Sequence, residues 1–252
     1  MAVRSLTIDI TGECQNRCAF CYNTNRAGAM PFERFKGIIE TFPSLERVEI
    51  GGGEPLLNPA LPGMVAHALS KKLRTDISTN CRIYPELIVR MDAGELLSLQ
   101  VNLPAGGEAE YDRITRTSGG FPIVMENIKL LATSGLKTRL RLTICKENAA
   151  QLEPVYHIAK ALKLPLIVAP AIPVDGLEIL GRDEMDDLFL RALLLRMAYK
   201  RMDFLWSYHE TSCPEVAKAY GVALKPLACT SFNGEKMYAD NAGNMKGCEF
   251  HA

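Results

Sequence analysis

The 252-residue sequence lacks long hydrophobic runs, because it has no uninterrupted stretch of about 18 apolar residues, the minimum for a membrane-spanning helix. Its first ten residues also lack the apolar segment of a secretory signal peptide. An excess of one charge is missing as well, since 29 Lys and Arg residues balance 29 Asp and Glu residues. A balanced chain attracts nucleic acid and anionic membranes only weakly. We therefore expect a cytoplasmic protein that binds neither.

Aromatic residues are scarce at 7%, but hydrophobic residues reach 48%, which is enough to bury a sizeable core. The length allows one large domain, or one domain with an appendage. Cysteine is not scarce, since there are eight residues. A reducing compartment does not favour a disulfide framework, so the cysteine spacing has to be examined for metal binding or catalysis.

Short runs rich in Val, Ile and Leu alternate with amphipathic stretches, a pattern typical of parallel strands joined by crossover helices. The expected strands are residues 6–10, 47–50, 75–78, 98–103, 138–144 and 165–169. The expected helices are residues 31–42, 60–72, 85–95, 121–134 and 152–162. Six units are too few for a complete eight-fold barrel. The predicted class is therefore α/β, a partial TIM-like (β/α)6 barrel or an open sheet.

The alternation stops after Pro173, which predicts a boundary near residue 176. Residues 183–204 are predicted to form one long helix. Further on, the segment Asp240-Asn241-Ala242-Gly243 predicts the turn of a hairpin. The predicted organisation is a barrel over 1–176, a helical connector over 177–211 and a small C-terminal region over 212–252.

Three cysteines, Cys14, Cys18 and Cys21, follow the first expected strand within eight residues. Three thiols on one loop can converge on one metal centre, and thiolates are the usual ligands of zinc and of iron-sulfur clusters. A structural zinc site takes four ligands, so a set of three leaves a position open for chemistry. The alternative is a structural zinc loop whose fourth ligand lies elsewhere. Loops that follow parallel strands build active sites in βα folds, and this loop is the first of them.

The spacing of three and then two residues, with Phe20 directly before the last cysteine, resembles the signature of the radical S-adenosylmethionine (radical SAM) enzymes. The resemblance implies a 4Fe-4S cluster on Cys14, Cys18 and Cys21, whose remaining iron binds the amino and carboxylate groups of S-adenosylmethionine. Reduction is then expected to release methionine and a 5′-deoxyadenosyl radical, which abstracts a hydrogen atom from the substrate. Phe20 is expected to pack near the adenine.

The ends of the next two strands add to the resemblance. Gly52, Gly53 and Glu54 follow the second strand and resemble the family's Gly-Gly-Glu motif, which holds the methionine amino group. On its own, this segment is only a glycine-rich turn. The third strand ends in Ser78-Thr79-Asn80, similar to a Thr-Asn pair of the family. The glycine that commonly follows that pair is here a cysteine.

Three further positions are expected cofactor contacts by the same resemblance. Asn102 stands where relatives often have a serine that binds the ribose or the carboxylate. Arg113 resembles the arginine that pairs with the methionine carboxylate, a role that suits a guanidinium group, although a solvated surface arginine is the alternative. Ala169, at the end of the sixth strand, is expected to contact the adenine through its backbone.

Two residues of the fifth strand region are candidate catalytic groups. Arg139 and Arg141 share one face of the strand, so Arg141 contacts substrate or cofactor if that face lines the barrel, and solvent if it does not. Cys81 and Cys145 are single cysteines at strand ends, and both are expected to be small buried hydrophobes. Cys145 has the alternative role of donating or accepting a hydrogen atom.

Cys213, Cys229 and Cys248 form a second group towards the end of the sequence. They resemble the opening of the SPASM and twitch extensions, which hold auxiliary iron-sulfur clusters in radical SAM enzymes. Such extensions continue with further cysteines, whereas this sequence has four residues after Cys248. The expectation is an incomplete extension, or an auxiliary cluster on three cysteines. Simple packing or a zinc site is the alternative.

The predicted function is therefore a radical SAM enzyme that modifies a peptide, reduced by a partner such as flavodoxin or ferredoxin. No recognition domain fits before Cys14, so a separate peptide-recognition protein is an expected partner. The alternatives among enzymes are a small-molecule dehydrogenase acting on a sugar or cyclitol, and an enzyme of cofactor maturation. From a different class, the alternative is a zinc-binding scaffold without catalysis.

Overall fold

The computed structural model describes residues 2–23, 25–91, 93–172, 174–204 and 236–246. In this part of the chain nine strands form one sheet in the order β7-β6-β5-β4-β3-β2-β1-β8-β9. The strands are β1 (Ser5–Asp9), β2 (Arg47–Gly51), β3 (Arg74–Thr79), β4 (Leu97–Asn102), β5 (Lys137–Ile144), β6 (Leu166–Pro170), β7 (Met202–Phe204), β8 (Lys236–Ala239) and β9 (Met245–Lys246). Neighbouring strands are parallel throughout, except that β9 is antiparallel to β8.

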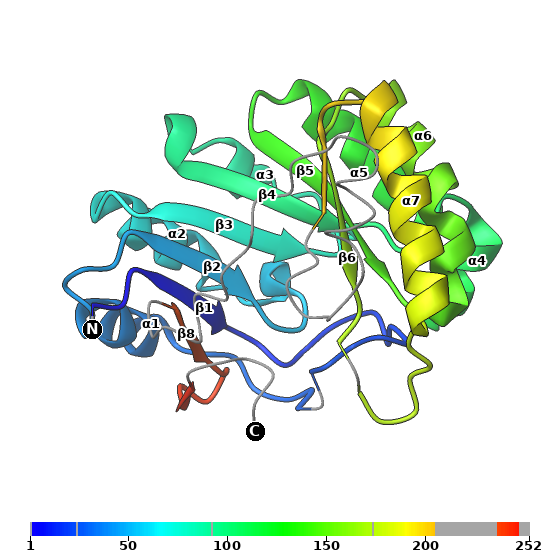
Figure 1. Cartoon of the computed structure of the whole chain (residues 1–252). Coiled ribbons are helices and arrows are strands. Elements are labelled where there is room, and N and C mark those ends of the chain that lie inside the picture. The colour runs from blue at the N-terminus through cyan, green and yellow to red at the C-terminus, as the bar shows by residue number, and fades with distance from the viewer. Residues whose placement is uncertain (1, 24, 92, 173, 205–235, 247–252) are drawn as a thin grey trace.

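Helices connect the strands and cover the outer side of the sheet, as Figure 1 shows. They are α1 (Phe32–Glu40), α2 (Leu61–Ser70), α3 (Glu86–Val89), α4 (Glu108–Thr115), α5 (Gly120–Thr133), α6 (Leu152–Ala161) and α7 (Arg182–Ala198). Three short 3-10 turns are η1 (Pro55–Leu57), η2 (Gly94–Leu96) and η3 (Lys146–Gln151). The sheet is open, so the predicted α/β partial barrel is confirmed. None of the described helices is both long and apolar enough to cross a bilayer.

The two faces of the sheet differ in chemistry, and β5 shows why. Its residues Leu140, Leu142 and Ile144 are fully or almost fully buried and join the main hydrophobic core with the helices. The residues between them, such as Arg139 and Arg141, are only partly buried and lie on the other face. Because side chains alternate along a strand, the outer face is apolar and the inner face is polar.

The six strands and most of the helices predicted between residues 6 and 169 are confirmed. Residues 85–95, predicted as one helix, contain only the four-residue α3 and the turn η2. Helix α4 was not predicted at all. These differences are local, and they leave the order of strand and helix unchanged.

The long helix predicted over residues 183–204 is wrong at its end, because α7 stops at Ala198. Tyr199 leaves the helical conformation, and its hydroxyl donates a hydrogen bond to the carbonyl of Leu164 at 2.8 Å. The chain then turns back, and Met202, fully buried, pairs with Leu166 as the first residue of β7. Burial of Met202 beside β6 therefore outweighs continuation of the helix.

The predicted hairpin is confirmed, since β8 and β9 are antiparallel and flank the turn. Beyond that prediction, β8 pairs in parallel with β1, with Ser5 opposite Lys236. In Figure 1 the red β8 lies beside the dark blue β1. The division at residues 176 and 211 remains a prediction, and the sheet itself includes strands from both sides of it.

Candidate active site

The cysteine loop follows β1 at the carboxyl edge of the sheet, and helix α4 holds it in place. The backbone amide of Arg17 donates to the carbonyl of Thr115 at 2.8 Å, and the amide of Ala19 donates to the carbonyl of Ile114 at 2.9 Å. Within the loop, the amide of Cys21 donates to the carbonyl of Cys18 at 3.1 Å. The loop therefore has a defined conformation that depends on an element more than 90 residues further along the sequence.

The three thiols of the loop, on Cys14, Cys18 and Cys21, are half-buried and close enough to influence one another. Burial, and then the neighbouring Cys21 and Cys14, raise the pKa of Cys18 to about 12. Burial also raises the pKa of Cys14. These shifts mean that ionisation of the Cys14 and Cys18 thiols is unfavourable without a cation beside them. A bound metal centre reverses this, because a coordinating thiol is deprotonated.

The donor set of the loop is three cysteine thiols, the residue type that binds iron-sulfur clusters. In a 4Fe-4S cluster each thiolate binds a different iron, so the sulfur atoms stand apart. The Cys14 sulfur also accepts hydrogen bonds from the backbone amide of Asn16 at 3.4 Å and from Asn80 Nδ2 at 3.5 Å. Such bonds are usual for thiolate ligands of iron-sulfur clusters.

Gly52 and Gly53 allow the loop after β2 to run directly against the loop after β1. A Cβ atom on Gly53 would lie 2.1 Å from the carbonyl oxygen of Glu13, and one on Gly52 would lie 2.4 Å from that of Thr11. Gly52 also has a φ of 116°, which side chains disfavour. The amide of Gly53 donates to the Thr11 carbonyl at 2.7 Å. The glycines are thus required by the contact between the two loops.

Glu54 is fully buried, and its carboxylate joins the ends of β2 and β3. It accepts hydrogen bonds from the Thr79 hydroxyl at 2.8 Å, the Asn80 amide at 2.7 Å and the Leu56 amide at 3.1 Å. Burial raises the pKa of Glu54 to about 7, although these three hydrogen bonds favour the charged form. The carboxylate therefore accepts from donors of the protein itself, and its hydrogen bond with the Asn80 amide holds the backbone of Asn80 in place.

The end of β3 carries residues of two kinds. Asn80 is buried and points to the cysteine loop, whereas Ser78 is exposed on the inner face and accepts from Gln100 Nε2 at 3.1 Å. Cys81 is fully buried, as expected, with a φ of 59°. This left-handed conformation favours glycine, so the backbone here suits the glycine that commonly follows the Thr-Asn pair in the family.

An apolar cluster forms the other wall of the site. Phe20 packs with Ile114, Cys145 and Ala171, and Cys18 lies against the same group. Cys145 is buried as expected, and its backbone amide donates to Asn148 Oδ1 at 2.8 Å. The wall combines the cysteine loop with α4 and the ends of β5 and β6. All four of these residues are buried, so they form a compact apolar cluster behind the cysteine loop.

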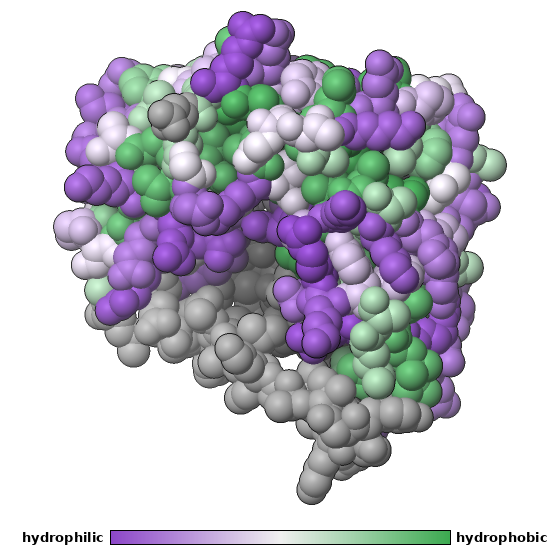
Figure 2. All heavy atoms as spheres, turned by 90° about the horizontal axis from the view of Figure 1, so that it is seen from above, coloured by the Kyte–Doolittle hydropathy of each residue, from purple (hydrophilic) through white to green (hydrophobic). Residues whose placement is uncertain are grey.

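The inner face of the sheet has two halves with different pairing. In its amino half, which we define as Arg47, Glu49, Asp76, Ser98 and Arg139, every charge is paired. Asp76 bonds Arg47 at 2.7 Å and Arg139 at 3.0 Å, and it also accepts from Ser98. Glu49 bonds Lys236 of β8 at 2.9 Å. Figure 2 shows that one face of the molecule is hollowed, with hydrophilic side chains along much of the rim.

Across β3 to β5, the carboxyl half of the inner face, defined as Ser78, Asn102, Arg141 and Thr143, contains one cation and no carboxylate, whereas the end of β1 holds the buried Asp9. Arg141 Nε donates to Thr143 Oγ1 at 3.3 Å, and Thr143 Oγ1 donates to Asn102 Oδ1 at 3.5 Å. Within the described ranges, Arg141 has no ion pair, whereas Arg139 two residues earlier has one. Arg141 lies on the inner face of β5, and its guanidinium group has further donors without a partner among the described residues.

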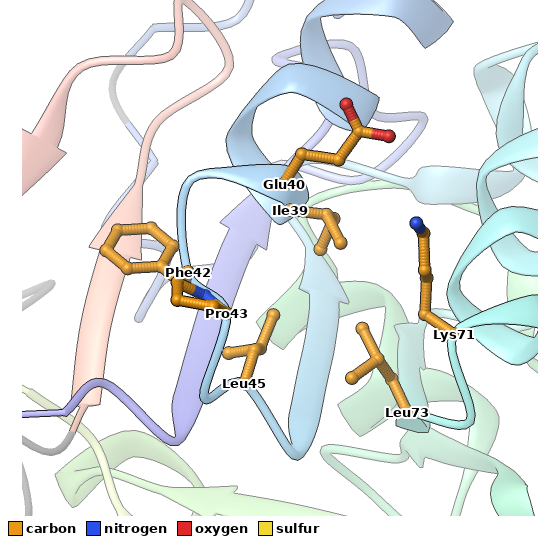
Figure 3. Close-up of a pocket in the computed structure, with 7 residues that line it drawn as sticks. All are labelled: Ile39, Glu40, Phe42, Pro43, Leu45, Lys71 and Leu73. Atoms are coloured by element: carbon orange, nitrogen blue, oxygen red, sulfur yellow. The ribbon is translucent and has the colours of Figure 1, made fainter.

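The cavity in Figure 3 lies elsewhere. It measures about 260 Å³ and is lined by residues of the ends of α1 and α2, among them Phe42, Leu45, Lys71 and Leu73. These residues lie near the amino ends of β2 and β3, opposite the cysteine loop. In parallel βα folds the active site is at the carboxyl edge, so this cavity is not the candidate active site.

The Radical SAM superfamily profile matches residues 8–159, which include the cysteine loop and the ends of β1 to β5. This chain belongs to the radical SAM superfamily. Membership implies S-adenosylmethionine and a 4Fe-4S cluster as cofactors, in agreement with the donor set described above.

Two curated relatives are similar to this chain in sequence. The mycofactocin maturase MftC of Mycobacterium tuberculosis is 29% identical over 161 residues, which is 61% of this chain and 41% of the relative. An Fe-coproporphyrin III synthase of Methanosarcina barkeri is 26% identical over 166 residues, which is 63% of this chain and 41% of the relative. The chain therefore spans about two-fifths of the length of these relatives.

Among solved structures, Streptococcus suis SuiB bound to the precursor peptide SuiA superposes with a TM-score of 0.79 at 16% sequence identity. The superposition covers 98% of this chain and 60% of SuiB. At this identity the likeness establishes the radical SAM fold, a partial barrel with the same open sheet.

The structure brings together most of the residues expected to form the radical SAM site. Ala169 is buried at the end of β6, opposite Thr143 in the sheet register. Arg113 lies on α4, but it is paired with Glu110 and, at 3.3 Å, with Glu147. A methionine carboxylate there has two protein carboxylates as competitors. Cys213, Cys229 and Cys248 lie outside the described residues.

Two contributors to the site were not predicted. Helix α4 anchors the cysteine loop, and Asn16 accepts hydrogen bonds from Arg82 at 3.1 Å and from Thr117 at 3.3 Å. The only sequence signal for a role of Asn16 was its position inside the cysteine motif. Arg82 and Thr117 come from separate loops, so no local pattern connects them.

Proposed function

We propose that this chain cleaves S-adenosylmethionine reductively and uses the resulting radical to remove a hydrogen atom from a substrate. The observation that carries the proposal is the half-buried loop of Cys14, Cys18 and Cys21 at the carboxyl edge of β1. When bound, a 4Fe-4S cluster on these residues supplies the electron that breaks the carbon–sulfur bond.

The other residues of the site bind and orient the cofactor in this proposal. Gly52 and Gly53 hold backbone close to the cysteine loop and leave carbonyl groups for the methionine amino group. Phe20, with the backbone of Ala169, supports the adenine, and Asn102 contacts the ribose or the carboxylate. Arg113 reaches the methionine carboxylate only by exchanging its present ion pairs.

The test is anaerobic reconstitution, followed by iron and sulfide analysis and an assay of 5′-deoxyadenosine driven by dithionite. We expect Cys14→Ser, Cys18→Ser and Cys21→Ser each to lose cleavage of S-adenosylmethionine. Cys81→Ala is the matched control, because it removes a buried thiol outside the loop. Retained cleavage in the three loop variants contradicts the proposal. Zinc binding with intact S-adenosylmethionine supports the scaffold alternative.

We further propose a peptide as the substrate, with Arg141 as the contact that holds a carboxylate of it. The support is the inward guanidinium group without an ion pair among the described residues, together with the maturase relative and the peptide complex of SuiB.

Cys145, buried in the apolar wall, has contacts that favour packing over hydrogen-atom transfer. Cys145→Ala with unchanged turnover is the expected result.

A porphyrin-related small molecule is the second candidate substrate, and the relation to a coproporphyrin synthase favours it. The discriminating experiment offers the reduced enzyme a panel of short acidic peptides and, separately, Fe-coproporphyrin III. Formation of 5′-deoxyadenosine above the basal rate, with a matching mass change in one substrate, identifies the class. A response to the porphyrin alone contradicts the peptide proposal.

An auxiliary iron-sulfur cluster on Cys213, Cys229 and Cys248 is part of the proposal, and iron analysis tests it. About eight irons per chain support two 4Fe-4S clusters, and about four support one.

We also propose flavodoxin or ferredoxin as the reductant, and a separate recognition protein for the peptide. Replacing dithionite with either reductant, and pull-down of the peptide with and without the candidate recognition protein, are the respective tests.

A further inference from the structure

We propose that Asn80 sets the reduction potential of the cluster by donating a hydrogen bond from its side-chain amide to the sulfur of Cys14. Asn80 is thus a positioning residue that acts through Cys14. The inference rests on the proposed function, because it presupposes a cluster on the cysteine loop.

The orientation of the Asn80 amide group is fixed by its neighbours. The backbone amide of Arg82 donates to Asn80 Oδ1 at 2.9 Å, so the oxygen faces away from the cysteine loop. Nδ2 must then face the loop, where it donates to Cys14 Sγ at 3.5 Å and to Gln15 Oε1 at 3.1 Å. Both N–H groups therefore have acceptors, and a flipped amide would lose all three bonds.

The backbone of Asn80 is held just as firmly. Its amide donates to Glu54 Oε2 at 2.7 Å, and the other oxygen of Glu54 accepts from the Thr79 hydroxyl. Asn80 is 9% exposed and Glu54 is fully buried, so water does not compete with these bonds. The chain of contacts from Glu54 through Asn80 to Cys14 therefore joins β2 and β3 to the first cluster ligand.

This contact has a predictable electrostatic consequence. Reduction adds negative charge to the cluster and its thiolates, and an N–H donor stabilises that charge. Removing the donor disfavours the reduced state, so the potential falls. A loss equal to a tenfold change in the one-electron equilibrium corresponds to about 59 mV.

The experiment is a redox titration of the reconstituted protein, followed by electron paramagnetic resonance of the reduced cluster. We expect Asn80→Ala to lower the midpoint potential by about 59 mV, which corresponds to a tenfold change in the one-electron equilibrium constant. Asn80→Asp replaces the donor with an oxygen and is expected to lower it further. A second readout is the coupling of exchangeable protons to the reduced cluster, from which both variants are expected to lose the contribution of the Asn80 side chain and keep that of the Asn16 backbone amide.

Asn127→Ala is the matched control. Asn127 is also 9% exposed, and its Nδ2 donates to the carbonyl of Cys81 at 2.9 Å without touching a cysteine of the loop. This control is expected to lose stability but to keep the potential and the proton coupling. If Asn80→Ala fails to load iron, Asn80→Ser, which can still accept from the Arg82 amide, takes its place.

The possible outcomes separate the inference from the proposed function. A wild-type protein that holds no iron-sulfur cluster contradicts the proposed function itself. A loaded wild type, together with a loaded Asn80→Ala or Asn80→Ser variant of unchanged midpoint potential and unchanged proton coupling, overturns the role of Asn80 alone. A lowered potential in the Asn127→Ala control to the same extent also overturns it.

Discussion

The two halves of the inner face differ in how their polar groups are satisfied. In the amino half, Asp76 joins Arg47 of β2 to Arg139 of β5 across the sheet. In the carboxyl half, Arg141 has a hydroxyl as its partner among the described residues. A fully paired network rigidifies a fold, whereas unused donors are available to a ligand. The comparison shows that a paired arginine, Arg139, and an arginine without an ion pair among the described residues, Arg141, lie two residues apart on one face of β5.

Gly53→Ala is expected to have the largest effect, because it separates the loop after β2 from the cysteine loop after β1. The added Cβ meets the Glu13 carbonyl oxygen at 2.1 Å, so one of the two loops must move. We expect a loss of about 3 kcal/mol in the free energy of unfolding and failure to assemble the cluster. Urea unfolding and iron analysis measure the two effects.

Gly37→Ala is the control for that variant. Gly37 lies inside α1, and a Cβ there meets no atom within 4 Å. Alanine in a helix interior is more favourable than glycine by about 0.5–1 kcal/mol, so this variant should gain stability and bind iron normally. Normal iron content in Gly53→Ala would show that the close contact between the loops is dispensable.

Asp76→Asn is expected to break the amino half. The carboxylate is mostly buried, and its loss leaves Arg139 without an ion pair among the described residues and Arg47 with Glu49 alone. We expect the free energy of unfolding to fall by about 2 kcal/mol, less than for a fully buried pair because Arg47 is 42% exposed. Denaturant titration of the loaded protein measures the loss. Unchanged stability would mean that the network is not holding the sheet.

Replacing Arg139 and Arg141 one at a time tests the difference between the two halves of the inner face. Arg139→Gln should lower stability by about 1 kcal/mol and leave basal cleavage of S-adenosylmethionine unchanged. Arg141→Gln should leave stability within about 0.5 kcal/mol and lower substrate-dependent turnover about tenfold or more. Equal effects of the two substitutions on both readouts would remove the distinction between the halves.

The smallest expected effect concerns pH and Glu49, the link between the amino half and β8. Burial raises the pKa of Glu49, but Lys236 and Arg47 outweigh it, so the pKa is lowered overall. A lowered carboxyl pKa stabilises the fold above its unfolded value of about 4.3 and loses that contribution as the pH falls through the folded value. Glu49→Gln should therefore be about 1 kcal/mol less stable than wild type at pH 6, and the difference should shrink as the pH falls below the unfolded value of about 4.3. A difference independent of pH would contradict the ion pair.

Much of the fold was predictable because its strands alternate or run apolar over five to eight residues. Helix α4 escaped prediction since its first turn is acidic and only Tyr111, Ile114 and Thr115 are buried. Strand β7 is three residues long, too short for a period to be recognised. The pairing of β8 with β1 joins residues more than 200 positions apart, and no local pattern encodes such a contact.

In the site, the cysteine spacing was enough to predict the loop and its chemistry. The directions of individual side chains were not predictable in this way. The resemblance predicts that Gly52, Gly53 and Glu54 hold the methionine amino group, but it does not predict that the Glu54 carboxylate accepts from donors of β3 and η1, which come together only in the folded chain. Arg113 likewise meets Glu147, a residue 34 positions away. Motifs specify which residues gather, and tertiary hydrogen bonds decide what each one touches.

The position of β8 beside β1 also has a consequence for biosynthesis. The turn of the β8–β9 hairpin contacts the loop after the cysteines, where Asn241 Nδ2 donates to the Ala27 carbonyl at 2.8 Å. Ribosomes add roughly 5–20 residues per second, so β8 emerges on the order of ten seconds or more after β1. During that interval one edge of β1 is unpaired and open to wrong association. The first strand of the sheet therefore gains its second strand neighbour only after the chain up to β7 has been synthesised.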